Sequence, residues 1–421
     1  MSVTIADAKW LRSRRLQTLL RALSEGGEEA RVAGGAVRNA LLDRPVSDVD
    51  IATTTVPEET VRRIEAAGFK AVPTGIEHGT ITAVANGRPY EVTTLRDDIE
   101  TDGRRAKVKF GRDWKRDAER RDFSINALYA TATGEVVDLV GGLADLDSRT
   151  IRFIGDAETR IREDFLRILR FFRFFAWYGE GRPHAEGLKA CARLKEGLDR
   201  LSAERVWSEL KKLLSAPDPS RALLWMRQAG VLSRILPESE KWGIDLVHRL
   251  VRTELDLGWE ADPMLRLETL LPPDPERIAA FYERLRLSSA EMERLKGWAE
   301  QRPIVATASE SALAKMLYEG DRQAIVDRLR LSLATARGKA ISDDGAMLAA
   351  GGFSRLLKFV EKWEKPEFPV KGRDLAAAGV SPGPKMGETL KRLEAEWIAS
   401  GFSFDREALL ARASTAATGK D

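Results

Sequence analysis

Apolar positions in the first 100 residues follow two different spacings, and together they predict a small sheet with helices. Residues 7–24 and 57–67 carry apolar side chains at helical spacing, and each run ends at glycine. Short alternating segments predict strands at residues 31–33, 70–74, 78–85 and 88–94. Asn86-Gly87 between the last two is the dipeptide typical of a tight hairpin turn. The N-terminal part is therefore predicted to be a small mixed β-sheet.

Beyond the predicted sheet the apolar spacing is almost entirely helical. We predict an α+β fold, with a β-sheet head at residues 1–140, a helical neck at 141–215, a helical body at 216–345 and a helical tail at 346–421. Residues 96–114 lose periodicity and are rich in charge and glycine, so they are predicted to form a long functional loop. Residues 411–421 are expected to be disordered.

Composition narrows the class of protein. A chain of 421 residues with 43% hydrophobic and 32% charged residues predicts a globular protein of two to four domains. One cysteine, Cys191, excludes an internal disulfide and a multi-cysteine zinc site, and it favours the cytoplasm. No apolar run is long enough to span a membrane, and a signal-peptide pattern is absent. The net charge of +3 indicates little by itself, but arginines cluster at 104–121, 160–173 and 200–234, which favours local binding of phosphates.

Residues 32–55 contain the first candidate chemistry. Asp48 and Asp50 are two apart at the head of a β-branched segment, so a strand would display both carboxylates on one face. Paired carboxylates are costly unless a cation lies between them, and Mg²⁺ takes oxygen ligands. Gly34-Gly35 precedes a short helix, where backbone N–H groups can bind phosphate, and Arg38 adds a fork of donors. Each feature alone also fits an ordinary turn or strand edge; their order along the chain favours a metal and phosphate site.

A second candidate site lies on the helical run at residues 163–177. Asp164 and Arg167 are three apart and would be neighbours on one helix face. Aspartate only accepts hydrogen bonds and arginine only donates them. Cytosine and adenine each present an amino donor beside a ring acceptor, whereas guanine and uracil present the reverse order. The pair therefore suits C and A, although a core helix with solvated arginines fits the same run.

Four segments resemble one enzyme family. They read V-A-G-G-A-V-R-N at 32–39, R-R-D-F-S-I-N-A-L at 120–128, E-D-F-L-R-I-L-R-F-F-R-F at 163–174 and S-A-E-R-V-W-S-E-L-K-K at 202–212. The chain is similar to the class II tRNA CCA-adding nucleotidyltransferases and bacterial poly(A) polymerases of the DNA polymerase β superfamily. That family normally has aspartate where this chain has Asn39. The similarity is dense over residues 31–214 and looser over 370–397.

The resemblance implies template-independent addition of C, C and A to the 3′ end of tRNA from CTP and ATP. It implies Mg²⁺ held by Asp48 and Asp50 as the catalytic carboxylates, with Glu91 as an open candidate for a third. The implied nucleotide-binding residues are Gly35, Arg38, Arg121, Asp164, Arg167, Arg170 and Arg173. On a straight helix Arg170 and Arg173 point about 120° and 180° away from Asp164, so we expect them to orient neighbouring groups or to meet phosphates.

The implied partner is the 3′ end and acceptor region of tRNA, with no membrane; the sequence does not define an oligomeric state. Glycines and basic residues at 370–387 suit contact with RNA phosphates. A bacterial poly(A) polymerase and an enzyme that adds only part of CCA share these motifs and stay open. Asn39 keeps open a non-catalytic RNA-binding relative, whereas the long segment at 96–114 argues against an enzyme that adds only CC.

Overall fold

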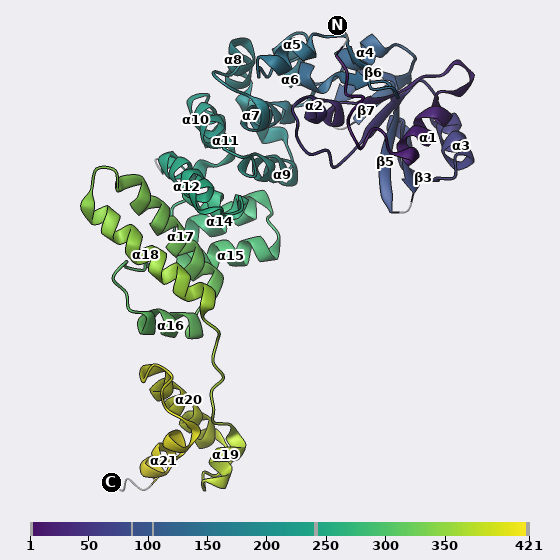
Figure 1. Cartoon of the computed structure of the whole chain (residues 1–421). Helices are drawn as coiled ribbons and strands as arrows, with labels where there is room; N and C mark the ends of the chain where they lie inside the picture. Colours follow the sequence, from purple (N-terminus) through teal and green to yellow (C-terminus); the bar gives the residue numbers. More distant parts are fainter. Residues whose placement is uncertain (1–2, 86, 103–104, 240–242, 418–421) are drawn as a thin grey trace. The chain divides into compact units, whose positions relative to one another are not determined.

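The computed structural model describes residues 3–85, 87–102, 105–239 and 243–417. Contacts between residues divide the chain into two compact units, Met1–Glu240 and Lys241–Asp421 (Figure 1). Unit 1 holds a β-sheet and a group of helices, and unit 2 is helical throughout its described part. A mixed sheet followed by helices is the α+β arrangement that the sequence predicted. The finer division into head, neck, body and tail stays a prediction.

A seven-stranded mixed sheet forms the head. Its strands are β1 (Ala30–Ala33), β2 (Asp50–Thr53), β3 (Lys70–Gly75), β4 (Thr80–Ala85), β5 (Arg88–Thr94), β8 (Leu128–Ala130) and β9 (Val136–Asp138). They lie in the order β3-β4-β5-β2-β1-β8-β9. Strands β2 and β5 pair in parallel and all other neighbours pair antiparallel. Strand β5 alternates as predicted, since Tyr90, Val92 and Thr94 are buried and Glu91 between them is exposed.

Three helices accompany this sheet: α1 (Arg14–Leu23), α2 (Gly35–Leu41) and α3 (Pro57–Ala66). Helix α1 buries a leucine stripe at helical spacing, made of Leu16, Leu19, Leu20 and Leu23. It begins seven residues later than the predicted start at residue 7, so the N-terminal boundary was wrong. Helix α3 agrees closely with the predicted segment, because Pro57 occupies its first turn and Gly68, with φ of +82°, follows its end.

The prediction of a loop at residues 96–114 was wrong for most of that segment. Strands β6 (Arg96–Asp102) and β7 (Arg105–Phe110) pair antiparallel as a separate two-stranded sheet, and α4 (Trp114–Glu119) follows. A hairpin of this kind is held by backbone hydrogen bonds between its own strands. Residues 105–110 read R-A-K-V-K-F, which alternates polar and apolar side chains, so a strand signal was present there and was overlooked; residues 96–102 contain a single apolar residue, Ile99, and give no such signal.

The other elements of unit 1 are α5 (Gly142–Asp147), α6 (Ala157–Glu163), α7 (Leu166–Tyr178), α8 (Ala185–Arg193), α9 (Ala203–Leu214), α10 (Ser220–Gln228), α11 (Val231–Ile235) and the 3-10 turns η1 (Glu25–Gly27), η2 (Ile76–His78), η3 (Ser124–Asn126), η4 (Lys195–Arg200) and η5 (Pro237–Ser239). Helix α7 packs against the segment before η3 through aromatic rings. The Phe123 ring lies 5.1 Å from Phe174, and the Phe153 ring stacks on Phe171 at 5.5 Å. These fully or nearly fully buried rings attach α7 to the head.

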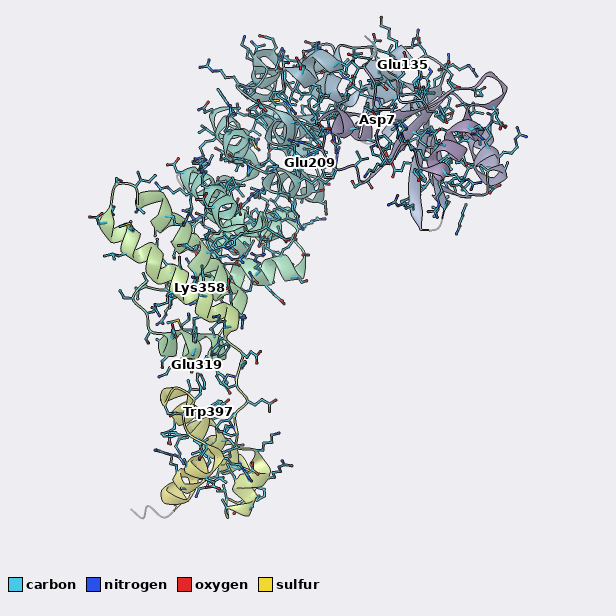
Figure 2. All side chains as sticks on the ribbon, in the orientation of Figure 1. Asp7, Glu135, Glu209, Glu319, Lys358 and Trp397 are labelled. Atoms are coloured by element: carbon cyan, nitrogen blue, oxygen red, sulfur yellow. The ribbon has the colours of Figure 1, made fainter. Side chains whose placement is uncertain are left out.

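Unit 2 consists of α12 (Ile244–Leu257), α13 (Pro263–Leu270), α14 (Pro275–Leu285), α15 (Ser289–Glu300), α16 (Glu310–Glu319), α17 (Arg322–Lys339), α18 (Asp344–Lys362), α19 (Gly372–Ala377), α20 (Pro384–Ala399) and α21 (Arg406–Ala417). A separate apolar cluster in the last three helices surrounds Trp397, which Figure 2 labels on α20. Because α21 continues to Ala417, the expected disorder from residue 411 was wrong over 411–417; residues 418–421 lie outside the described chain. A search of the described helices finds none with the length and apolarity of a transmembrane span.

A buried ion pair in unit 2 provides a test of its stability. Arg266 and Glu254 are 2% and 3% exposed, and Arg266 Nη2 donates to Glu254 Oε2 at 2.7 Å. We predict that Glu254→Ala lowers the free energy of unfolding by about 3–5 kcal/mol, because the guanidinium stays buried without this carboxylate. Asp256→Ala on the same helix removes an exposed ion pair with Arg337 and should cost less than about 1 kcal/mol. Urea denaturation of both variants measures the difference, and equal losses would contradict the prediction.

Candidate active site

A glycine turn between β1 and α2 forms one wall of the site. Gly34 has φ of +65°, and a Cβ atom there would lie 3.3 Å from both Arg121 Nη1 and the Asn126 carbonyl oxygen. A side chain at this position is therefore disfavoured by conformation and by space. Gly35 begins α2, and its Cβ position would lie 3.6 Å from Arg38 Nη2. The turn brings bare backbone next to two arginines, whereas phosphate binding by this turn stays a prediction.

The sheet sets Asp50 directly beside that turn. Asp50 is opposite Ala33, the last residue of β1, and also opposite Glu91 in parallel strand β5. Residues opposite one another in a sheet project to the same face, so the Asp50 and Glu91 carboxylates are neighbours. Strand β2 begins at Asp50, so Asp48 lies before it in a segment without regular secondary structure. The prediction of both aspartates within one strand was wrong for Asp48.

The three carboxylates influence one another electrostatically. Partial burial raises the pKa of Asp50, and the negative charges of Glu91 and then Asp48 raise it further, while the charge of Arg121 opposes them. This concentration of negative charge suits a divalent cation with oxygen ligands. Among the described residues no three acidic, histidine or cysteine side chains already converge as a metal-binding group. Asp50, Asp48 and Glu91 are the residues of this site that could hold a metal ion.

Arg38 is buried in the site without a carboxylate partner among the described residues. Its side chain is 6% exposed, and burial lowers its pKa to about 10. Its hydrogen bonds go to neutral groups: Nε and Nη2 donate to Asn39 Oδ1 at 3.2 and 2.9 Å, Nη2 donates to the Tyr178 hydroxyl at 2.8 Å, and Nη1 donates to Asn126 Oδ1. A buried cation held this way retains its charge for an anionic ligand.

Arg121 and Arg120 flank a buried carboxylate at the end of α4. Asp117 is 1% exposed and receives Arg120 Nη2 at 2.6 Å and Arg121 Nη2 at 3.1 Å, together with the Tyr129 hydroxyl at 2.7 Å. Burial by itself would raise the pKa of Asp117, but the charges of Arg121 and Arg120 and these hydrogen bonds lower it. Asp117 thus fixes both guanidiniums beside the glycine turn.

The base-reading residues predicted on one helix belong to different elements. Helix α6 ends at Glu163 and α7 begins at Leu166, so Asp164 lies in the extended link between them. The Asp164 carboxylate accepts from Arg205 Nη2 at 2.6 Å, not from Arg167. Arg167 Nη1 donates to the Arg160 carbonyl oxygen at 2.8 Å and pairs with Glu163. The expected helical Asp164–Arg167 pair was therefore wrong in its secondary structure.

Arg170 and Arg173 differ in position. Arg170 forms an ion pair of 2.6 Å with Asp122, whose carboxylate is buried. Burial alone would raise the pKa of Asp122, but the charge of Arg170 and hydrogen bonds lower it to about 2. Arg173 Nε donates instead to Glu209 at 2.5 Å, a residue labelled on α9 in Figure 2. The two arginines thus pair with carboxylates of different elements, and their expected role, to orient neighbouring groups or to meet phosphates, stays a prediction.

Many of these residues line one cavity of about 520 Å³, a size ordinary for ligand pockets. Its lining is Gly34, Gly35, Arg38, Asp50, Arg120, Arg121, Asp122, Asn126, Asp164, Leu166, Arg167, Arg170, Phe174 and Arg205. Six arginines against three aspartates make the lining positive, which favours an anion such as a triphosphate. Of the predicted nucleotide-binding residues, Arg173 is the one that lies outside this lining.

A second cavity, in unit 2, lacks that excess of charge. It has a volume of about 490 Å³, and apolar side chains such as Leu331 and Phe353 form much of its wall. Its two basic residues, Arg328 and Lys339, are matched by Glu268 and Asp343. Its charge therefore suits a polyanionic substrate less well than that of the cavity at the glycine turn.

Comparisons with known proteins identify the family. Residues 30–152 match the family model of the Poly A polymerase head domain, and residues 183–242 match the model of the probable RNA and SrmB-binding site of polymerase A. The mouse protein CCA tRNA nucleotidyltransferase 1, mitochondrial, is 34% identical over 399 residues, which cover 94% of this chain and 88% of the relative. The chain belongs to the CCA tRNA nucleotidyltransferase family.

A bacterial relative and a solved structure extend the comparison. The CCA-adding enzyme of Streptococcus sanguinis is 34% identical over 93% of this chain and 95% of its own. The crystal structure of the Bacillus stearothermophilus CCA-adding enzyme in complex with CTP has a TM-score of 0.71 at 24% identity, covering 96% of this chain and 97% of that one. The structural match supports the fold alone. The predicted family and fold class are confirmed.

The residues that sequence reasoning missed lie far along the chain from their partners. Tyr178 contacts Arg38 across 140 positions, and no local signal identified it. Asp122 was noted only as part of a motif, although it joins the head to α7 through Arg170. Arg205 was likewise noted only within the motif at 202–212, and its ion pair with Asp164 joins α9 to the link between α6 and α7. Nucleotidyltransferase motifs thus indicated the segments, whereas the individual pairings required the fold.

The raised pKa of Asp50 gives a stability prediction. A carboxyl whose pKa is raised in the folded state binds its proton more tightly there than in the unfolded chain, so stability is lost as pH rises from about 4 through the raised value. In EDTA we expect Asp50→Asn to have a higher Tm than the wild type at pH 7, with the difference shrinking as the pH falls toward 4. Thermal unfolding followed by circular dichroism measures this. Asp147→Asn, an exposed control, should change nothing; a destabilised Asp50→Asn would contradict the prediction.

Proposed function

We infer that this protein adds C, C and A to the 3′ end of tRNA, using CTP and ATP and no nucleic-acid template. The observation that carries this function is the positive cavity in which a glycine turn, Asp50 and the Asp164 link converge. Full-length relatives from mouse and Streptococcus sanguinis bear the names CCA tRNA nucleotidyltransferase and CCA-adding enzyme. Solved structures of similar fold are CCA-adding enzymes described with CTP, ATP or tRNA.

We propose that the glycine turn and the arginines bind the triphosphate. The backbone at Gly34 and Gly35 can approach phosphate oxygens closely, and Arg38 and Arg121 supply charge-assisted hydrogen bonds. The transferred α-phosphate then lies toward Asp50, which is next to the turn in the sheet. Holding the reacting groups in one place is itself a large part of catalysis of this type.

We propose Asp48 and Asp50 as ligands of Mg²⁺, with Glu91 as a third carboxylate. Their mutual repulsion at Asp50 is the property that fits a divalent cation. When bound, the metal lowers the pKa of the primer 3′-hydroxyl and neutralises the triphosphate. Asp50 begins β2 and is opposite Glu91 within β5, so the sheet holds these two carboxylates side by side.

Base selection is proposed for Asp164 and Arg167, although they lie in different elements. Asp164 accepts and Arg167 donates, so together they match the amino group and ring nitrogen of cytosine or adenine. Arg205 and Glu163 each hold one member of the pair, which reduces the freedom of both. Uracil or guanine would leave these polar groups without partners inside the cavity, and that mismatch is costly.

The first test is extension of a tRNA that lacks its terminal CCA. We expect CTP and ATP together to add three nucleotides and then stop, with Asp50→Ala abolishing extension while tRNA binding persists. Product length on a denaturing gel and tRNA affinity by filter binding measure both effects. A long A tract would instead identify a poly(A) polymerase, addition of only C or only A a partial enzyme, and no extension by the wild type a non-catalytic RNA-binding protein.

A second test concerns the choice of base. Asp164→Asn replaces a pure acceptor by a group that also donates, which suits the uracil carbonyl oxygen. We predict that the ratio of kcat/KM for CTP over UTP falls by about 10–100-fold, within the range expected for polar mismatches. Asp199→Asn removes an exposed ion pair with Arg234 in the same unit and should leave the ratio unchanged. An unaltered ratio in Asp164→Asn would remove this residue from base selection.

The cytoplasmic location stays a prediction based on cysteine content, because the mouse relative is named as a mitochondrial protein. Contact of the tail at 370–387 with RNA also stays a proposal. Helix α20 begins there at Pro384, and exposed Lys385 in its first turn suits phosphate contact without reading bases.

A further inference from the structure

Four of the five N–H groups of Arg38 donate to neutral side chains, and this arrangement is unusual for a buried cation. Asn39 accepts two of them, Asn126 accepts one, and the hydroxyl of Tyr178 accepts the fourth at 2.8 Å. None of these acceptors carries a charge. The guanidinium is thus held in one orientation, and its positive charge is not neutralised by its own supports.

Tyr178 contributes a second contact through its ring. The Arg38 guanidinium carbon lies 4.0 Å from the centre of the Tyr178 ring, and that of Arg44 lies 4.9 Å from the same centre. The ring faces attract both cations, so Tyr178 serves as a platform as well as a hydrogen-bond acceptor. Arg44 in turn donates to the Trp177 carbonyl oxygen at 2.6 Å, which keeps the segment after α2 against the end of α7.

Asn39 has a matching orientation. Its Nδ2 donates to the Pro45 carbonyl oxygen at 3.1 Å, and this bond turns Oδ1 toward Arg38. A carboxylate at this position has no N–H to donate and would add a negative charge beside the guanidinium. The amide therefore positions Arg38 without reducing the charge that the cavity presents to a phosphate.

A series of hydrogen bonds begins and ends on α7 and passes through Arg38 of α2. Arg170 pairs with Asp122, Asp122 accepts from Asn126 Nδ2 at 3.0 Å, and Asn126 accepts from Arg38. Arg38 in turn donates a hydrogen bond to the hydroxyl of Tyr178, which is also on α7. Positions 170, 174 and 178 are four apart and share one helix face, and the Phe174 ring between them lies 5.4 Å from both Arg38 and Arg170. One face of α7 therefore holds Arg38, the arginine next to the glycine turn.

We propose that Tyr178, assisted by Asn39, is a positioning residue that holds Arg38 oriented and fully charged for the triphosphate of the incoming nucleotide. The inference rests on the proposed function of the cavity and adds a specific determinant to it. Dipoles and donors fixed before the substrate arrives need not reorganise during the reaction, and this is how such a support increases the rate. A free arginine side chain would instead lose considerable rotamer freedom on binding.

Tyr178→Phe is the decisive variant, because it keeps the ring and removes the acceptor oxygen. We expect kcat/KM to fall about 10-fold for CTP and for ATP alike, as for one hydrogen bond to a charged group, with Tm nearly unchanged. In an Arg38→Lys background, Tyr178→Phe should lower kcat/KM by less than about 2-fold, because the guanidinium that Tyr178 positions is absent. Asn39→Ala, a second and partly exposed position, should behave in the same non-additive way.

Trp177→Phe is the matched control on the same helix. It removes one side-chain hydrogen bond, from Trp177 Nε1 to the Lys212 carbonyl oxygen at 2.8 Å, and should leave kcat/KM for both nucleotides unaltered. An undiminished kcat/KM in Tyr178→Phe, or an equal loss with and without Arg38, would overturn the proposal. If the wild type extends no tRNA, the proposed function fails; the same double-mutant cycle on the Kd of CTP, measured by titration calorimetry, then decides the positioning role separately.

Discussion

The ion pair between Asp122 and Arg170 is the contact on which the geometry of the site depends. It links the head segment after α4 to helix α7 at 2.6 Å, and Asp122 also accepts from the backbone N–H of Phe123 at 2.9 Å. Breaking a buried pair leaves a charge without compensation, so the two elements cannot separate cheaply. The ring of Phe123 packs beside this pair against Phe174. Polar and apolar contacts thus fasten α7 at the same place and bring the Asp164 link and the arginines near the glycine turn to one cavity.

The cavity keeps an excess of positive charge because most of its arginines are held by groups other than its own carboxylates. Arg38 is supported by neutral side chains, and Arg167 by a backbone carbonyl and by Glu163 outside the lining. Arg121 shares Asp117 with Arg120, so two cations divide one anion. In a partly enclosed space such charges act strongly. A triphosphate would supply the negative charge that the cavity lacks. The hydrogen bonds described above hold the guanidinium groups in place, and the cavity still keeps a positive charge for an anionic ligand.

Sequence reasoning located the segments that form the candidate site, but it predicted their local geometry less well. The glycine turn, Asp50 and the arginine-bearing segments meet in the structure as the motif order indicated. Asp164 was assigned to a helix because its neighbours have helical spacing, yet its backbone is extended, with φ of −155° and ψ of 109°. Its carboxylate binds Arg205 and the N–H of Leu166, which together favour a break between α6 and α7. Such side-chain contacts compete with helix formation and leave no trace in a hydrophobic pattern.

By itself, the sequence determined the elements whose signals are local: the amphipathic stripe of α1, the alternation of β5, the turn at Gly34-Gly35 and the order of the motifs. Only the tertiary structure decided which charges meet. Glu91 becomes the neighbour of Asp50 through the register of parallel strands, and Tyr178 becomes the partner of Arg38 through the docking of α7. The physical reason is the separation along the chain over which each kind of interaction acts. Helical and strand periodicities are set within a few residues, whereas electrostatic and hydrogen-bond partners are chosen by packing between segments that are distant along the chain.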